Sequence, residues 1–213
     1  MRRFGDTFFI ALQDSMDVFG VGLLLSLALI SCIGSAAAGQ VTSIDTTGSK
    51  LLIHVSKSGV FSGFADNHEV EAQIYEGNVD AKDGRLKLSV DSRQMKVLDP
   101  QLSPDKRRQV QERMLGPEVL DSSRYPHIVF ESSKVNRNQD GSVQVDGQLV
   151  LHGVTKPISI LAREIGGRYV GSFVLKQRDF GITPVRIAGG TVKVKDELKI
   201  EFEIQTSSGG IAK

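Results

Sequence analysis

Residues 192–204 read VKVKDELKIEFEI, and most of their apolar side chains recur at every second position. The apolar positions are Val192, Val194, Leu198, Ile200, Phe202 and Ile204, and the positions between them are charged. A side-chain period of two is that of a β-strand with one face in a core and the other in water. Asp196 interrupts the apolar face, so we expect a bulge or turn near residues 195–197.

The same alternation extends through most of the chain. It is clear at residues 51–55, 86–90 and 143–151, and further strand candidates are Glu69–Gly77, His127–Lys134, Ile158–Ile165 and Tyr169–Lys176. Asp83-Gly84, Asp140-Gly141 and Gly166-Gly167 separate these segments, and such dipeptides are typical of tight hairpin turns. About eight strands, each with one apolar face, predict an all-β fold in which an antiparallel sheet closes over one core.

One segment departs from the strand pattern. Ser103 has the character of a helix N-cap, and Pro104 suits the first helical position. The chain then runs without Gly or Pro until Gly116-Pro117 stops it. We therefore expect one short helix, with Met114 and Leu115 packed on the mouth of the barrel.

Length and composition indicate one globular domain. The chain has 213 residues, of which 40% are hydrophobic and 24% charged, and no internal repeat or linker divides it. Lys plus Arg (26) nearly balances Asp plus Glu (25), so nothing in the net charge favours nucleic acid or an anionic membrane surface. A single Cys excludes an intramolecular disulfide.

Residues 1–38 differ from the rest and resemble an export signal. Arg2 and Arg3 supply positive charge, residues 18–33 are uncharged and apolar, and the small residues Ser35–Ala38 suit a signal peptidase. The apolar run is short for a membrane span. We expect residues 1–38 to be a signal peptide and the mature protein to be exported to the periplasm or cell envelope.

Cys32 allows a second interpretation of the same leader. It ends the stretch Leu29-Ile30-Ser31-Cys32, which resembles the lipobox of bacterial lipoproteins. Acylation of Cys32 would anchor the protein to a membrane by lipid alone, whereas cleavage after Ala38 would discard this residue. Both alternatives stay open at this point.

No pattern of catalytic residues is apparent. A Gly-x-Ser-x-Gly elbow, a phosphate-binding Gly loop and paired Cys-x-x-Cys ligands are all absent, and the four His lack zinc-site spacing. Asp179 has no accompanying nucleophile or second acid, and we interpret Arg178–Asp179 as a structural pair that orders a turn. We therefore predict a protein that is not an enzyme and holds neither metal nor cofactor.

His68 is the most informative of the four His. It follows a stretch, residues 61–67, in which aromatic, small and polar side chains mix near a predicted strand start. A neutral imidazole there can hydrogen-bond a ligand headgroup, and its protonation near pH 6.5 would change that bond. Alternatively, nearby backbone or Asp66 satisfies the ring and no ligand is involved.

Four motifs carry a resemblance to a known family. The stretches are VDGQLVLHGVTKPI at residues 145–158, KQRDFGI at 176–182, DSSRYP at 121–126 before the IVFES strand at 128–132, and VKDELKI at 194–200. In this order they resemble the YceI-like family, over most of the chain from Leu51 to Ile204. The resemblance implies a lipocalin-like, eight-stranded antiparallel barrel, which we place at residues 39–206. It also implies an elongated apolar pocket for isoprenoid or other amphiphilic chains. The low-complexity end of the chain predicts a flexible tail at 207–213.

The sequence departs from the family around its helix. The segment from Val97 to Leu120 is longer and more charged than the family's Asp-x-His-Leu segment, and that His-Leu is not matched; Val119-Leu120 stands nearest. The departure concerns the shape of the pocket and the identity of the ligand.

We predict that the barrel holds an isoprenoid, a quinone or another amphiphilic, lipid-like ligand without changing it. The apolar candidates are Phe61, Phe64, Phe130, Leu149, Leu151, Phe173 and Leu175, with Met114, Leu115 and Phe180 closing one end. His68, Arg178 and Asp179 are the candidates for contacts to a polar headgroup. The alternative is a secreted interaction module with a solid barrel and partner-binding loops, and a homodimer is compatible with either. A continuous cavity would favour ligand binding, and a filled interior would favour the module.

Overall fold

The computed structural model describes residues 41–58, 67–80, 83–187 and 191–207. These belong to one compact unit, Ala38–Lys213. The predicted signal peptide with Cys32, the candidates Phe61 and Phe64, and residues 208–213 of the predicted tail lie outside the described residues. Within the described ranges, no helix has the length and apolar character needed to span a membrane.

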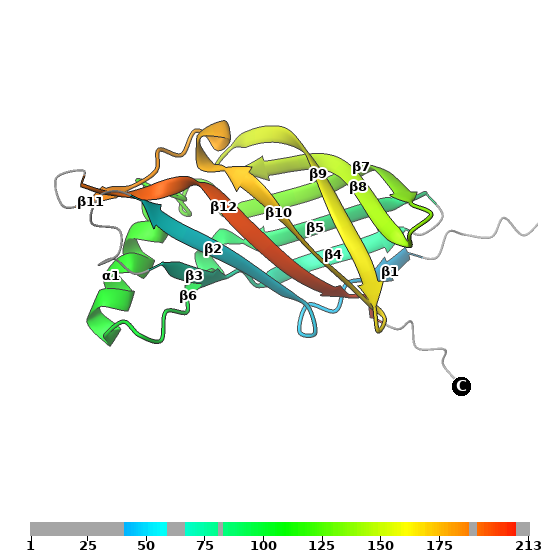
Figure 1. The fold of residues 1–213 in the computed structure, drawn as a ribbon, viewed down its shortest axis with the longest axis horizontal. Helices are drawn as coiled ribbons and strands as arrows, with labels where there is room; N and C mark the ends of the chain where they lie inside the picture. The colour runs from blue at the N-terminus through cyan, green and yellow to red at the C-terminus, as the bar shows by residue number, and fades with distance from the viewer. Residues whose placement is uncertain (1–40, 59–66, 81–82, 188–190, 208–213) are drawn as a thin grey trace, which may run out of the picture. The chain divides into compact units, whose positions relative to one another are not determined.

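The unit is built almost entirely of antiparallel strands (Figure 1). The strands are β1 (Val41–Ser43), β2 (Lys50–Ser58), β3 (His68–Glu71), β4 (Ile74–Asp80), β5 (Arg85–Asp91), β6 (Lys96–Val97), β7 (His127–Arg137), β8 (Ser142–Leu151), β9 (Val154–Ile165), β10 (Arg168–Lys176), β11 (Arg186–Ile187) and β12 (Val192–Gln205). The described residues also form one α-helix, α1 (Pro104–Leu115), and two 3-10 turns, η2 (Ser92–Gln94) and η3 (Gln177–Phe180).

The strand pairs run around a ring, which confirms the predicted lipocalin-like antiparallel barrel with one short helix. The order is β2, β3 with β4, β5 with β6, β7, β8, β9, β10, β12 and back to β2. The strand count differs slightly from the prediction. Ala72-Gln73 interrupts one strand of the ring, which is therefore counted as β3 and β4. The turn η2 interrupts another strand, which is counted as β5 and β6.

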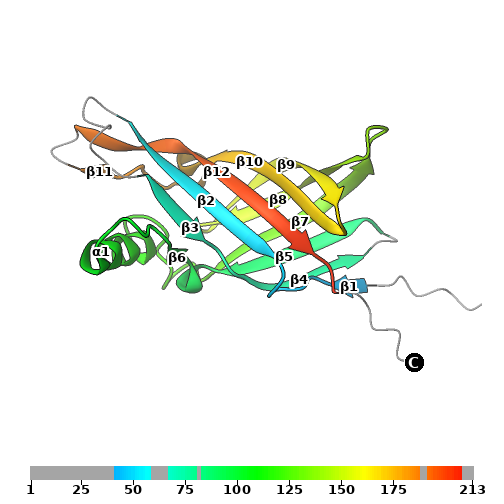
Figure 2. The ribbon, with the colours of Figure 1, turned by 60° about the horizontal axis from the view of Figure 1, so that its bottom comes forward.

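A seam in the ring is closed by β1. β2 pairs with β12 along most of its length but meets the neighbouring strand only over β3. β1 pairs with β4 beyond that point, and Ile44 forms an isolated bridge with Thr206 at the end of β12. Two further backbone bonds of 2.8 Å cross here, from Asp45 N to Gln205 O and from Ser207 N to Ser43 O. Figure 2 shows β1 beside the ends of β4 and β12.

The turns and the bulge follow the sequence. Gly166 and Gly167 join β9 to β10 with φ of 58° and 78°, values that glycine adopts without steric cost. The pairing of β12 with β2 shifts register between Val194 and Leu198, as the interrupted alternation at Asp196 predicts. The predicted bulge is therefore confirmed.

Helix α1 begins and ends as its capping residues predict. Ser103 Oγ accepts a hydrogen bond from Lys106 N, and Gly116 N donates to Glu112 O. Gln111 ties the helix to the barrel: its side chain accepts from Val97 N at 2.7 Å and donates to Met95 O at 2.6 Å. Figures 1 and 2 place α1 beside β3 and β6, at the end of the barrel opposite β1.

Candidate ligand cavity

The half of the barrel away from α1 encloses a cavity of about 390 Å³. Its wall is mainly apolar and comes from β2, β4, β5, β7, β8, β9, β10 and β12. The apolar lining residues are Leu51, Val79, Leu86, Leu88, Val90, Ile128, Phe130, Val135, Val143, Val145, Leu149, Ile158, Ile160, Ala162, Phe173, Phe202 and Ile204. These side chains stand at the inward positions of their strands, because successive residues of a strand face opposite sides of the sheet.

Two glycines at inward positions leave space for aromatic rings. A Cβ atom on Gly147 would lie 2.6 Å from Phe130 Cζ, and one on Gly171 would lie 2.6 Å from Phe202 Cζ. Each ring therefore lies against the wall where a side chain is missing. Both Phe130 and Phe202 also line the cavity, so the glycines let large rings pack without filling it.

Polar groups gather at the β1 end of the cavity. Asp80, Arg85, Arg137, Tyr169 and Thr206, with Gly84, complete its lining. The guanidinium of Arg137 donates to the Tyr169 hydroxyl at 3.2 Å and to the Glu164 carboxylate at 3.4 Å. The neighbouring Tyr169, and to a lesser extent Glu164, raise the pKa of Arg137, so this side chain stays positively charged. The cavity thus combines apolar walls with cations at one end.

At the opposite end of the barrel, the described side chains pack into a core. Its buried side chains include Val70, Met95, Val97, Leu120, Leu151, Phe180 and Ile182, and Val110, Met114 and Leu115 pack against them. Phe180, from η3, is only 2% exposed. We call this region the filled end, and the region around the cavity the hollow half.

The predicted apolar residues divide between these two regions. Phe130, Leu149 and Phe173 line the cavity. Met114, Leu115, Leu151, Leu175 and Phe180 belong to the packed core and are not among the lining residues. Phe130 and Leu149 belong to the same hydrophobic cluster, so only the lining of the cavity distinguishes the two groups. A ligand-binding role for any of them stays a prediction.

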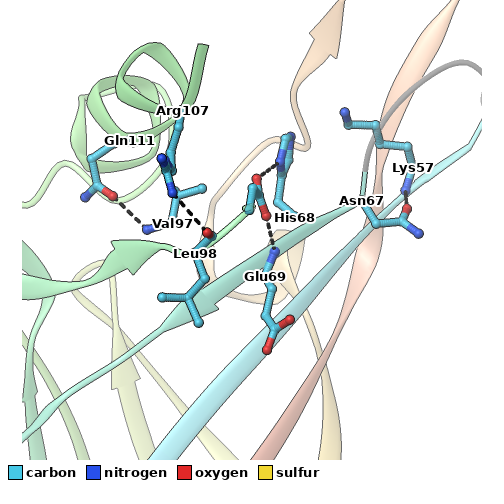
Figure 3. A network of polar contacts seen from close by, with 9 residues as sticks. Lys57, Asn67, His68, Glu69, Val97, Leu98, Arg107 and Gln111 are labelled. Atoms are coloured by element: carbon cyan, nitrogen blue, oxygen red, sulfur yellow. Dashed lines mark hydrogen bonds and ion pairs between the residues drawn. The ribbon is translucent and has the colours of Figure 1, made fainter. Parts of the chain in front are cut away.

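His68 lies at the filled end, where its ring is bonded within the protein. Its Nδ1 is 2.5 Å from Asp99 Oδ2, and Asp99 is 1% exposed. The other oxygen of Asp99 accepts from Glu69 N at 2.8 Å. Figure 3 shows this network, with Arg107 of α1 reaching Leu98 O close by. His68 joins β3 to the segment before α1 and is not among the residues that line the cavity.

Arg178 contacts the carboxylate of Asp196 at the β12 bulge and not that of its neighbour Asp179. Arg178 N donates to Asp196 Oδ1 at 3.0 Å, and Nε lies 4.0 Å from Asp196 Oδ2. Asp179 is exposed. The predicted Arg178–Asp179 pair is therefore wrong, because the bulge turns Asp196 toward η3. The turn is ordered instead by bonds from Gln177 Nε2 to Lys195 O and between His152 Nδ1 and Phe180 O.

The site offers enclosure and charge rather than reactive groups. Among the residues that the structure describes, no three His, Cys, Asp or Glu side chains are placed to hold a metal ion. Sequence reasoning missed Arg85, Arg137 and Tyr169, which stand at strand ends with no distinguishing motif. It also missed Gly171, although a glycine inside an apolar alternation is a signal of close packing.

A comparison with family models identifies the family of this chain, and two further comparisons found relatives in sequence and in fold. The YceI-like domain matches residues 42–206. A UPF0312 protein of Vibrio parahaemolyticus is 28% identical over 195 residues, covering 87% of this chain and 96% of that protein. A UPF0312 protein of Pseudomonas aeruginosa is 40% identical over 75 residues, covering 30% and 39% of the two chains. The crystal structure of BcnA from Burkholderia cenocepacia shares the fold, with a TM-score of 0.57 at 17% identity, covering 76% of this chain and 98% of BcnA.

Proposed function

Because this chain belongs to the YceI-like family, we propose that it binds an isoprenoid, a quinone or another amphiphilic lipid in its barrel and leaves it chemically unchanged. The family consists of binding proteins for hydrophobic ligands such as polyisoprenoids. The observation that carries the proposal is the apolar cavity of about 390 Å³ in the hollow half. Ligand pockets in proteins have volumes of about 300–1,000 Å³ and mainly apolar linings.

The binding energy comes from removing the ligand's apolar chain from water. Burial contributes about 25 cal/mol per Å², so about 300 Å² of buried chain contributes about 7 kcal/mol before the cost of association. Residues from eight strands line the cavity and are already held by the sheet. A preformed wall of this kind lowers the ordering cost of binding.

The polar end of the cavity would receive the ligand's headgroup. Arg85 and Arg137 are cations there, Asp80 supplies a carboxylate, and the Tyr169 hydroxyl is a further hydrogen-bonding group. A carbonyl, hydroxyl or phosphate oxygen on the headgroup would accept from these donors. The ligand would then lie with its headgroup toward β1 and its chain toward the filled end.

A pair of matched variants tests the proposal. Ala162→Leu adds bulk to a buried residue of the cavity wall, whereas Val174→Leu adds a methylene on the outer face of β10, where Val174 is 61% exposed. We expect farnesol and decylubiquinone to raise the melting temperature of the wild type and of Val174→Leu, and to do so much less for Ala162→Leu. Failure of both compounds to stabilise the wild type, together with no co-purifying lipid in native mass spectra, would reject the proposal.

A protein-interaction module is the second candidate function. It predicts a solid barrel, and the cavity of about 390 Å³ is the observation against it. If the lipid experiments fail, this candidate takes the lead, with the charged helix α1 as its first surface to test.

We also propose that the protein is exported. The basic start, the uncharged residues 18–33 and the small residues before Gly39 support this. Expression of the full chain in a bacterium, followed by denaturing mass spectrometry of the envelope fraction, tests it. A mass that begins after Ala38 would indicate a periplasmic protein, an acylated Cys32 would indicate a lipoprotein, and an unprocessed cytoplasmic chain would overturn the proposal.

A further inference from the structure

A second hollow lies on the filled end, outside the barrel. It has a volume of about 350 Å³ and lies where the end of β10, η3, β11 and the first half of β12 meet. Its lining residues are Ser58, Lys176, Arg178, Pro184, Arg186, Lys193, Val194, Lys195, Asp196 and Glu197. We call it the basic groove. It shares no lining residue with the ligand cavity.

Positive charge exceeds negative charge in the basic groove. Five of its residues are Lys or Arg, and two are carboxylates. One of these carboxylates, Asp196, accepts from Arg178 N and lies 4.0 Å from the Arg178 side chain. Within the ranges that the structure describes, Arg186, Lys193 and Lys195 make no ion pair. The groove therefore holds three cations without an ion-pair partner among the described residues, and its lining carries five cations against the carboxylates of Asp196 and Glu197.

The strand register forces two of these cations together. Arg186 of β11 is directly opposite Lys193 of β12, and Ser58 of β2 is opposite Lys193 on its other side. Like charges directly opposite each other destabilise an antiparallel pair. Lys195 follows two residues later, with its exposed side chain on the same face.

The rest of β12 shows that this arrangement is not general. Lys199 and Glu201 are paired at 2.6 Å on the outer face of the strand's second half. Arg168 on the neighbouring strand pairs with Glu203. Charges there are neutralised pair by pair, whereas at the groove they accumulate, which is the arrangement that a bound anion would stabilise.

We propose that the basic groove binds a phosphoryl group, as a diphosphate or a phosphate ester. Phosphoryl oxygens carry multiple negative charge and accept several hydrogen bonds at once, which matches a concave set of ammonium and guanidinium groups. Arg186 can bind two oxygens with its planar fork, and Lys193 and Lys195 supply point charges beside it. The Ser58 hydroxyl adds a neutral donor at the edge. The inference does not depend on the proposed lipid ligand, because the groove and the cavity are separate.

Titration of the full chain with inorganic pyrophosphate at low salt tests this site. We expect Lys193→Gln to weaken binding at least tenfold, and Lys199→Gln, the same charge change on the same face of β12, to alter it less than twofold. Without pyrophosphate, Lys193→Gln should raise the melting temperature, since it removes the repulsion with Arg186. No binding to the wild type at millimolar pyrophosphate, or equal weakening by both substitutions, would overturn the proposal.

The source of the phosphoryl group can be found in the same series. Vesicles containing phosphatidic acid, compared with vesicles of phosphatidylcholine alone, show whether a lipid headgroup enters the groove. Binding to phosphatidic acid that pyrophosphate displaces and Lys193→Gln weakens would identify a membrane phosphate. Pyrophosphate binding without vesicle binding would identify a free phosphorylated molecule.

Discussion

The filled end and the hollow half are parts of one ring of strands with one pattern of alternation, yet the cavity of about 390 Å³ lies in the hollow half and a packed core lies at the filled end. At the filled end, segments between strands fold inward and deliver bulky groups such as Phe180, Ile182 and Leu120. In the hollow half, the inward residues of the strands form the wall. Two of these residues, Phe130 and Phe202, have rings that lie over glycines. The alternation thus specifies the wall, and the contents of the interior are specified by loops and by the size of inward residues.

The largest expected difference between the two regions is in the cost of removing a phenyl ring. Phe180→Ala at the filled end should lower the free energy of unfolding by about 3–5 kcal/mol, because it leaves a void in a packed core. Phe173→Ala in the hollow half should cost clearly less, because that ring already borders empty space. Urea denaturation of both variants measures the difference. Equal losses would mean that the hollow half is packed in solution.

The His68–Asp99 pair gives the next largest effect. His68→Ala should destabilise the protein by about 3 kcal/mol, because it leaves the Asp99 carboxylate buried without its partner. His54→Ala is the matched control: His54 lies near Glu201 on the outer face, and both side chains are more than a third exposed. Thermal unfolding should show a marked loss for the first variant and almost none for the second. Equal melting temperatures would show that the pair does not hold the filled end together.

Gly171→Ala tests how the cavity stays open. The added methyl group would meet Phe202 and the backbone oxygen of Leu161, so we expect a loss of about 1–3 kcal/mol and a smaller cavity. Lipid-induced stabilisation should fall together with stability. Gly141→Ala is a useful comparison, since no atom lies within 4 Å of its added Cβ and only its φ of 79° is unfavourable. If only Gly141→Ala reduced lipid binding, the role assigned to Gly171 would be incorrect.

The smallest expected effect is a pH dependence at Asp91, where β5 ends at the filled end. Bonds from the Arg93 side chain hold the pKa of this carboxyl far below its usual range. Its folded-state pKa is lower than its unfolded one, so its contribution is present above about pH 5 and is lost as the pH falls toward 2. Asp91→Asn should therefore cost about 1–2 kcal/mol at pH 7 and clearly less at pH 3, where part of the contribution has been lost. Urea midpoints at the two pH values measure this, and a constant difference would contradict it.

The sequence predicted what depends on local pattern and failed where distant residues meet. Alternation located the strands, Ser103 and Gly116 located the helix ends, and Asp196 located the bulge. The His68–Asp99 contact joins residues 31 positions apart, and no local signal indicates it. The division of the interior into a packed end and a cavity could not be predicted either, because it depends on which loops fold inward.

Candidate site residues were predicted with the same asymmetry. Phe130, Leu149 and Phe173 were predicted because they face inward on long strands. The structure places all three at the cavity. Phe180 faces inward as well, but it comes from η3 and packs at the filled end. Arg137 and Tyr169 could not be predicted as site residues from the sequence, because they meet only where the ring brings the ends of β7 and β10 together.

The closure of the ring between β2 and β12 has a kinetic consequence. Most strand pairs join neighbours along the chain, but closure joins β2 to β12, where Ser49 and Gln205 are 156 residues apart. Contacts of such long range form late in folding, because the entropy of a large loop must be lost first. Leu51 lies on β2, and Phe202 and Ile204 lie on β12, so a ligand in the cavity would touch both of the strands that close the ring. Its residence time and the opening rate of β2 and β12 would then be coupled, and amide exchange in those strands would slow when the cavity is occupied.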